Sequence, residues 1–358
     1  KKSLLELYNK PLLELVFEAA TMHRQYHDPR EVQMSSLLSI KTGGCSEDCG
    51  YCPQAARYNT DVDAQKLMTV DSVVKQAKNA KENGSSRLCM GAAWREVRDN
   101  KDFDNVIEMV QAVNDLDMEV CCTLGMLSEN QAERLKNAGL FAYNHNLDTS
   151  ADYYDDVIST REYEDRLNTI ENARKAGISV CSGGIIGMGE AVEDRVGLLM
   201  SYMEMEMPPE SIPINALVAV EGTPMADQKP IEQWEMIRMV ATTRIAFPQS
   251  VVRLSAGRTK MNMEGQALCF MAGASSIFAG DKLLTTPNPE YNEDMEMFKI
   301  LGLIPKKSFA DGEKPVSKPD AIIEERKKKE KARAEQLAEA REASTREGFE
   351  PRKVTLVK

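Results

Sequence analysis

The chain is poor in the features that mark membrane proteins, disulfide-stabilised domains and nucleic-acid-binding proteins. None of its apolar runs approaches the roughly eighteen residues of a membrane-spanning helix. Its eight cysteines are too few for a disulfide scaffold in 358 residues, so we expect a reducing compartment and thiolate ligands. The formal net charge of −11 argues against a general affinity for nucleic acid or an anionic membrane. What remains is a folded chain with a sizeable core, because 42% of its residues are hydrophobic.

The first residues do not have the pattern of a signal peptide. Lys1 to Phe17 predicts one amphipathic helix, with Leu4, Leu5 and Tyr8 among its apolar positions. We therefore expect a cytoplasmic protein, or a protein of the mitochondrial matrix if the source is a eukaryote.

Between about residues 35 and 280, short apolar or alternating segments take turns with helical patterns. The predicted strands are 35–41, 86–91, 118–124, 141–146, 178–183, 212–220, 251–255 and 275–279. The predicted helices are 70–82, 102–116, 129–138, 161–175, 192–206, 231–246 and 259–271. Gly84, Gly139 and Gly177 come one or two residues after predicted helices, which is the signal of a helix C-cap before a strand.

Eight strands that alternate with helices predict an α/β protein with a TIM-type (β/α)8 barrel. An open, doubly wound sheet with a second domain is the alternative. We expect one domain over residues 1–310, which includes N-terminal helices outside the barrel. Residues 311–358 predict a charged tail, helical or disordered, because Ala321–Ala343 is dominated by Glu, Lys, Arg and Ala. A partner-binding helix is the minor alternative for this tail.

Three of the eight cysteines lie together in one glycine-containing loop after the first predicted strand. Cys45, Cys49 and Cys52 have a C-x3-C-x2-C spacing, which lets three thiolates converge. Structural zinc wants four ligands, and neither a further Cys nor a His lies nearby in the sequence. The spacing therefore favours a [4Fe–4S] cluster with one iron open for chemistry. A zinc site or three buried free cysteines are the alternatives.

This loop resembles the signature of the radical S-adenosylmethionine (SAM) superfamily. The aromatic residue before the last cysteine, Tyr51, is also typical of that superfamily. The resemblance implies that SAM chelates the open iron, and that the reduced cluster cleaves SAM to methionine and a 5′-deoxyadenosyl radical.

Other cysteines share a phase along the predicted strands. Because side chains alternate between the faces of a strand, Cys89, Cys121, Cys181 and Arg253 should all point into the barrel. By the same alternation, Cys122 should pack outward. Three thiols and an arginine among polar neighbours favour a second metal site, although a buried cysteine is often only a small hydrophobe. Guanidinium has no free lone pair, so physical reasoning alone makes Arg253 a charge partner of an anionic cluster.

Longer stretches narrow the resemblance to the biotin synthase family within that superfamily. It covers Pro11 to Pro305 and rests on stretches that begin at His27, Leu38, Cys89, Tyr143, Val180, Pro213, Val252 and Leu284, the last ending at Pro289. The resemblance implies a [2Fe–2S] cluster bound by Cys89, Cys121, Cys181 and Arg253.

The same resemblance assigns the small-molecule contacts. It implies that Asn146 and Asn215 contact the ureido ring of dethiobiotin, and that Asp148 contacts the ribose of SAM. Arg166 matches the position that pairs with the SAM carboxylate, and Ala92 lies in the stretch that cradles the SAM amino group. Without the resemblance, Asn146 and Asp148 would fit ordinary turn or capping chemistry.

The reaction implied is insertion of sulfur between two saturated carbons of dethiobiotin, with the inner cluster as sulfur donor. The partners implied are a flavodoxin or ferredoxin electron donor and a second copy of the chain in a homodimer. The rival hypotheses are another kind of radical SAM enzyme and a non-catalytic protein stabilised by zinc or a cluster.

Overall fold

The structure is a computed structural model that describes residues 2–280, 282–286, 288 and 291–346. Some predicted features lie outside this range: Lys1 of the first helix, Pro287 and Pro289 of the last matched stretch, and residues 347–358 of the tail. The described chain divides into two units, the first ending at Ser317 and the second beginning at Lys318. No described helix is long and apolar enough to cross a membrane.

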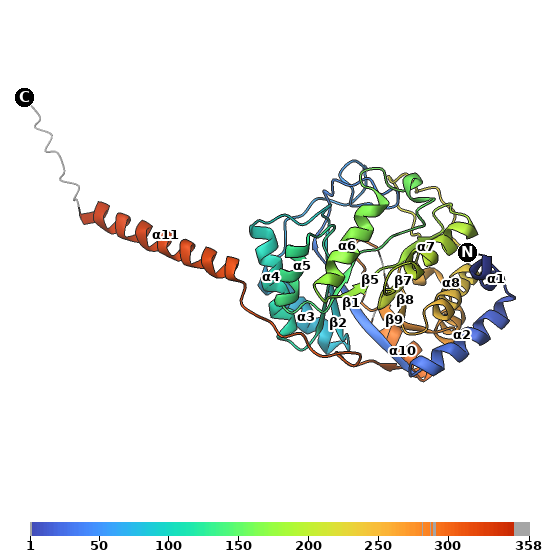
Figure 1. Ribbon diagram of the computed structural model, residues 1–358. Coiled ribbons are helices and arrows are strands. Elements are labelled where there is room, and N and C mark those ends of the chain that lie inside the picture. The colour runs from blue at the N-terminus through green and yellow to red at the C-terminus, as the bar shows by residue number, and fades with distance from the viewer. Residues whose placement is uncertain (1, 281, 287, 289–290, 347–358) are drawn as a thin grey trace, which may run out of the picture. The chain divides into compact units, whose positions relative to one another are not determined.

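The first unit is built on a closed barrel of eight parallel strands (Figure 1), as predicted. Neighbouring strands follow the order β1-β2-β3-β4-β5-β7-β8-β9, and β9 pairs with β1 where Ser276 lies opposite Gln33. Two short strands lie off this ring, β6 beside β7 and β10 beside β1. The bounds are β1 Glu31–Lys41, β2 Arg87–Ala92, β3 Glu119–Thr123, β4 Ala142–Asn144, β5 Ser179–Cys181, β6 Gly184–Ile186, β7 Ser211–Ala216, β8 Val251–Leu254, β9 Ala274–Phe278 and β10 Ile304–Pro305.

The helices surround the strands because each strand also presents an apolar face outward. Leu88, Met90, Val120 and Cys122 on that face are at most 1% exposed. The bounds are α1 Lys2–Tyr8, α2 Leu12–Tyr26, α3 Val70–Glu82, α4 Lys101–Asn114, α5 Glu129–Asn137, α6 Tyr163–Lys175, α7 Val192–Met203, α8 Gln233–Ala246, α9 Met263–Met271 and α10 Tyr291–Leu301, with 3₁₀ turns at Tyr154–Asp156 and Arg258–Lys260. The second unit contains α11, Ala321–Arg346, in agreement with the helical option for the tail.

Local sequence signals explain several helix ends. Ser128 and Gln131 form a capping box at the start of α5, and Asn100 caps α4 by accepting from the Phe103 N–H. Gly139 and Gly177 have φ of 100° and 71°, a left-handed conformation that favours glycine at a helix C-cap. These caps turn the chain directly into β4 and β5.

The structure corrects three details of the prediction. The segment Lys1 to Phe17 is not one helix, because Pro11 precedes α2 with a fixed φ and cannot donate to the preceding turn. The strand predicted over 178–183 ends at Cys181, and β6 follows as a separate strand. The helix α10 was not predicted at all.

A buried histidine in α2 makes the stability of the fold depend on pH. His23 is 1% exposed and its Nδ1 has no hydrogen-bond partner. Burial, with the nearby charge of Arg244, lowers the pKa of His23 from 6.5 to about 3. Below pH 6.5, His23 therefore binds a proton in the unfolded chain but not in the folded chain. Stability that is present above pH 6.5 is lost as the pH falls toward 3.

We expect His23→Phe to weaken this pH dependence. The wild-type free energy of unfolding should fall between pH 6 and pH 4, and the variant should fall less steeply, by up to about 1.4 kcal/mol per pH unit. Urea unfolding of the cluster-free chain at several pH values measures both slopes. Gln25→Ala, on the exposed side of the same helix, is the control and should keep the wild-type slope. Equal slopes for His23→Phe and wild type would contradict the assignment.

Candidate active site

The loop after β1 brings three cysteines to one wall of a cavity of about 330 Å³. Cys45, Cys49 and Cys52 all line it, and the Cys52 N–H donates to the Cys49 carbonyl at 2.9 Å to close the turn. Gly43 enters the loop with a φ of 67°, and a Cβ there would lie 2.8 Å from the Asp63 carbonyl oxygen. The glycine is therefore required both by backbone conformation and by space.

Two acidic residues inside the motif anchor this loop to the segment before α6. Asp48 accepts hydrogen bonds from the Ser159 and Thr160 N–H groups at 3.0 and 3.1 Å. Although burial opposes ionisation, the hydrogen bonds from Ser159 and Thr160 lower the pKa of Asp48 to about 2. Glu47 lines the cavity, with its Oε1 3.9 Å from the Arg161 Nε. Asp48 and Glu47 thus tie the part of the loop between Cys45 and Cys49 to residues 159–161.

The loop thiols fit a cluster better than a single metal ion. All three are free, and burial raises the pKa of Cys49 to about 11 and that of Cys52 to about 12, so iron binding would displace protons. Within the described ranges, no three His, Cys, Asp or Glu side chains converge closely enough for one metal ion. Thiolates on one zinc lie only about 3.8 Å apart, given Zn–S bonds of about 2.3 Å. Thiolates that bind different irons of a cluster are spaced more widely.

The second set of thiols lies deeper in the barrel, as the strand alternation predicts. Cys89 and Cys121 face each other in the paired strands β2 and β3, and both line the same cavity as the loop cysteines. Cys181 on β5 is fully buried and is not among the lining residues. Its Sγ lies 3.8 Å from the Nη1 of Arg253, a residue that does line the cavity.

The electrostatics of this inner set fit an anionic group. A hydrogen bond from Cys121 lowers the pKa of Cys89 against the effect of burial, and the charges of Arg253 and Arg87 add to the lowering. Arg253 is 1% exposed and forms no ion pair with any carboxylate of the described residues. Its Nε donates to the Ser276 hydroxyl at 2.9 Å instead. A buried cation without a carboxylate is suited to thiolates and a negatively charged cluster.

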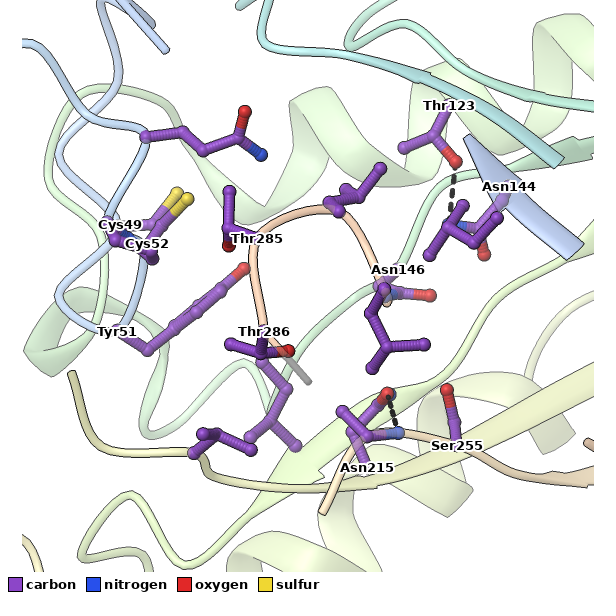
Figure 2. A pocket seen from close by; sticks show the side chains of 18 of the residues that line it. Cys49, Tyr51, Cys52, Thr123, Asn144, Asn146, Asn215, Ser255, Thr285 and Thr286 are labelled. Carbon is purple, nitrogen blue, oxygen red and sulfur yellow. Dashed lines mark hydrogen bonds between the residues drawn. The ribbon is translucent and has the colours of Figure 1, made fainter. Parts of the chain in front are cut away.

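The cavity between the two thiol sets is lined by four more predicted site residues. Tyr51, Ala92, Asn146 and Asn215 are all lining residues. Figure 2 shows Cys49 and Cys52 at one side of the cavity and Asn146 and Asn215 across it. These asparagines lie at or just beyond the carboxyl ends of barrel strands, where active sites of this fold are found.

Two predicted SAM contacts lie behind the cavity wall rather than in it. Asp148 and Arg166 form a buried ion pair, with the Arg166 Nη2 2.5 Å from the Asp148 Oδ2. The same oxygen accepts from the Tyr51 hydroxyl at 2.7 Å, and Arg166 also donates to the Tyr154 hydroxyl at 2.8 Å. In this arrangement, Asp148 and Arg166 position Tyr51, while their direct contact with SAM stays a prediction.

Some cavity residues were missed by reasoning from the sequence. Glu47 and Arg161 carry charge into the cavity, and Thr285 and Thr286 reach it from the loop after β9 (Figure 2). Glu47 could have been noticed, because it lies within the cysteine motif. The others lie in loops whose course depends on tertiary packing, so no pattern marks them.

Two family models match consecutive parts of the chain. The radical SAM superfamily model matches residues 39–201, which include the loop cysteines, Cys89, Cys121 and Cys181. The model of the biotin and thiamin synthesis associated domain matches residues 213–304, which include Asn215 and Arg253. Each inner ligand candidate therefore lies within a matched region.

The chain is similar to curated enzymes over most of its length. It is 69% identical to biotin synthase of Flavobacterium johnsoniae over 309 residues, which are 86% of this chain and 85% of that protein. It is 60% identical to mitochondrial biotin synthase of Arabidopsis thaliana over 301 residues, which are 84% of this chain and 80% of that protein.

Solved structures agree on the fold. The structure resembles methylornithine synthase with a TM-score of 0.73 at 18% identity, over 86% of this chain and 94% of that one. It resembles a maturase of the [FeFe]-hydrogenase with a TM-score of 0.71 at 18% identity, over 84% of this chain and 70% of that one.

Proposed function

The chain belongs to the biotin synthase family of radical SAM enzymes, and from that premise we propose that its cavity holds SAM and dethiobiotin between two iron–sulfur clusters. The observation that carries this proposal is the single cavity shared by both thiol sets. Cys45, Cys49 and Cys52 line one part of it, and Cys89 and Cys121 line another. A radical formed at one set could thus reach a substrate that also touches the other.

Each thiol set has its own chemistry to support. The loop thiols would hold a [4Fe–4S] cluster, and the inner thiols with Arg253 would hold a [2Fe–2S] cluster. When bound, the first supplies the electron that splits SAM to methionine and a 5′-deoxyadenosyl radical, and the second supplies sulfide.

The chain itself must shield a reactive species and orient the substrate. The unactivated C–H bonds of dethiobiotin are not acidic, so no general base in the cavity could substitute for a radical. Apolar side chains such as Leu37, Ile185 and Val218 line the cavity beside the polar ones and limit access of water. The main role of the barrel is therefore to orient the substrate and to keep water away from the radical.

The two cavity asparagines suit a urea group. The amide of Asn215 is fixed, because its Nδ2 donates to the Gly184 carbonyl at 2.9 Å and its Oδ1 accepts from the Ala256 N–H at 3.2 Å. The Oδ1 of Asn146 accepts from the Gly183 N–H at 3.1 Å. A neutral amide offers both donors and acceptors, which matches an uncharged urea. Because both side chains are held by backbone groups, they are oriented before substrate binds.

We expect Asn215→Ala to raise the KM for dethiobiotin by about ten- to a hundredfold, the cost of losing one buried polar contact. The KM for SAM should change by less than about threefold, because Asn215 is assigned to the other ligand. Steady-state kinetics with each ligand varied in turn measure both constants. Asn172→Ala is the control and should leave both constants unchanged, because Asn172 lies in α6, outside the cavity lining, and its amide donates to the Leu127 carbonyl. A variant that raises the two KM values equally would contradict the assignment.

An anaerobic assay with SAM, dithionite and dethiobiotin tests the function as a whole. Both 5′-deoxyadenosine and biotin should form. Cleavage of SAM without biotin would favour a different radical SAM reaction. Zinc without acid-labile sulfide in anaerobically purified protein would overturn the enzyme hypothesis altogether.

Other expectations from the sequence stay predictions. These are the flavodoxin or ferredoxin electron donor, the homodimer, the location in the cell and the division at residue 310.

A further inference from the structure

The inner thiols lie between two very different ends of the barrel. Toward the carboxyl ends of the strands, Cys89 and Cys121 face the cavity. Toward the amino ends, Arg87 and Glu119 stand two positions earlier on the same strands and the same face, about 6.6 Å further down. Whatever reaches the thiols must pass through the cavity or through this lower layer.

In the lower layer, both carboxylate oxygens of Glu119 accept hydrogen bonds from neighbouring residues. The Glu119 Oε2 accepts from the Arg87 Nε at 2.8 Å and from the Gln33 Nε2 at 3.0 Å. The other carboxylate oxygen accepts from the Phe309 N–H at 2.7 Å. Gln33, Arg87 and Glu119 are 4%, 6% and 2% exposed. Any passage here would have to separate a buried ion pair, which is unfavourable.

A strap formed by residues 304–309 covers this layer from outside. Its first residues form β10 on the edge of β1, and the Ser308 hydroxyl donates to the Ser86 carbonyl at 2.7 Å. Phe309 has a φ of 58°, an uncommon conformation for a non-glycine residue, and its N–H reaches Glu119 in this conformation. The ring of Phe309 packs edge-on against the ring of Phe141, with the two ring centroids 5.8 Å apart.

Phe141 connects the strap to the charged layer. The Arg87 guanidinium lies over the Phe141 ring, with its Cζ 5.3 Å from the ring centroid. The Phe141–Phe309 pair thus packs against the Arg87 side of the ion pair and reduces its contact with water. The amino end is sealed by two successive layers, whereas the carboxyl end is a cavity of about 330 Å³.

We propose that iron and sulfide reach Cys89 and Cys121 only through the cavity that also takes SAM and dethiobiotin. This inference rests on the proposed function. It places a step in the reaction sequence: the inner site can be loaded or rebuilt only when the cavity is empty, so product must leave first. Bound dethiobiotin therefore blocks rebuilding of the inner cluster, although its own conversion requires that cluster.

The test uses thiol labelling, which does not depend on turnover. Full-length protein that retains the loop cluster and lacks the inner one is treated anaerobically with N-ethylmaleimide. Mass spectrometry then gives labelling rates at Cys89 and Cys121, with and without saturating SAM and dethiobiotin. Cys122, buried on the outward face of β3, reports labelling that requires unfolding.

We expect SAM and dethiobiotin together to slow labelling of Cys89 and Cys121 at least about fivefold relative to Cys122, because an occupied cavity leaves no path. If labelling of Cys89 and Cys121 slowed less than this relative to Cys122, the proposal would be overturned. The same holds if the labelling rates of all three cysteines fell together. Access from the amino end would give ligand-insensitive labelling that Phe309→Ala accelerates. Reconstitution of the inner cluster with iron and sulfide, followed by absorbance, should show the same block by SAM and dethiobiotin.

Two controls separate this proposal from the function on which it rests. Equilibrium dialysis with labelled dethiobiotin checks that the cavity is occupied, and SAM cleavage by the same preparation is measured in parallel. Absence of binding or of cleavage would count against the proposed function. Binding and cleavage without protection of the thiols would count against shared access alone.

Discussion

Replacing Cys49 by alanine is expected to abolish SAM cleavage, with formation of 5′-deoxyadenosine falling by at least about a thousandfold. Cys49 is 7% exposed, lies between the other two loop cysteines in the sequence and lines the cavity with them. With two thiolates left, the loop can no longer hold a cube that leaves one iron open for SAM. Chromatography of anaerobic reactions with dithionite measures 5′-deoxyadenosine directly, and iron and sulfide analysis shows whether the cluster is lost.

The matched control for this variant is Cys269→Ala. Cys269 is fully buried, but it lies in α9 and does not line the cavity. Its variant should keep the iron content and the SAM cleavage of wild type, apart from a modest loss of stability. If Cys49→Ala retained more than about a tenth of wild-type cleavage, Cys49 would not be a ligand of the first cluster.

The second large effect is expected at Cys121, where the two halves of the reaction should separate. Cys121→Ala should still cleave SAM and should form no detectable biotin. The loop cysteines are untouched, whereas the inner set loses a thiol that pairs with Cys89 across β2 and β3. Measuring both products in the same reaction gives the ratio of biotin to 5′-deoxyadenosine, which should fall to zero in this variant.

The neighbouring residue supplies the control for Cys121. Cys122 is just as buried, yet the strand alternation directs it away from the cavity, and it is absent from the lining. Cys122→Ala should keep both products at near wild-type levels. Loss of biotin in Cys122→Ala, or its retention in Cys121→Ala, would mean that the inner site has been assigned to the wrong face of β3.

The sequence was most informative where periodicity and spacing are strict. A period of two separates Cys121 from Cys122 without any knowledge of the fold, and the structure has this orientation. The cysteine loop is local, so its spacing alone indicates a cluster. Gly139 and Gly177 mark the ends of helices because the chain turns there through a left-handed backbone conformation that favours glycine.

Features that depend on distant segments could not be predicted in this way. The strap that ends at Phe309 contacts Glu119, which is 190 residues away in the sequence. The pair of Asp148 and Arg166 was assigned to SAM by resemblance, whereas the structure shows the two side chains bound to each other, with Asp148 also accepting from the Tyr51 hydroxyl. Their geometry depends on how β4 and α6 pack, and no local pattern encodes it.

The central claim is that sulfur held by the inner thiols ends in the product. The most direct measurement is a single anaerobic turnover of protein whose inner site has been rebuilt with sulfide of a heavy sulfur isotope, in buffer that contains ordinary sulfide. Mass spectrometry of the biotin formed should show the heavy isotope in most of it, at a yield no greater than the number of inner sites. Biotin with ordinary sulfur, formed while the heavy isotope stays on the protein, would contradict the account.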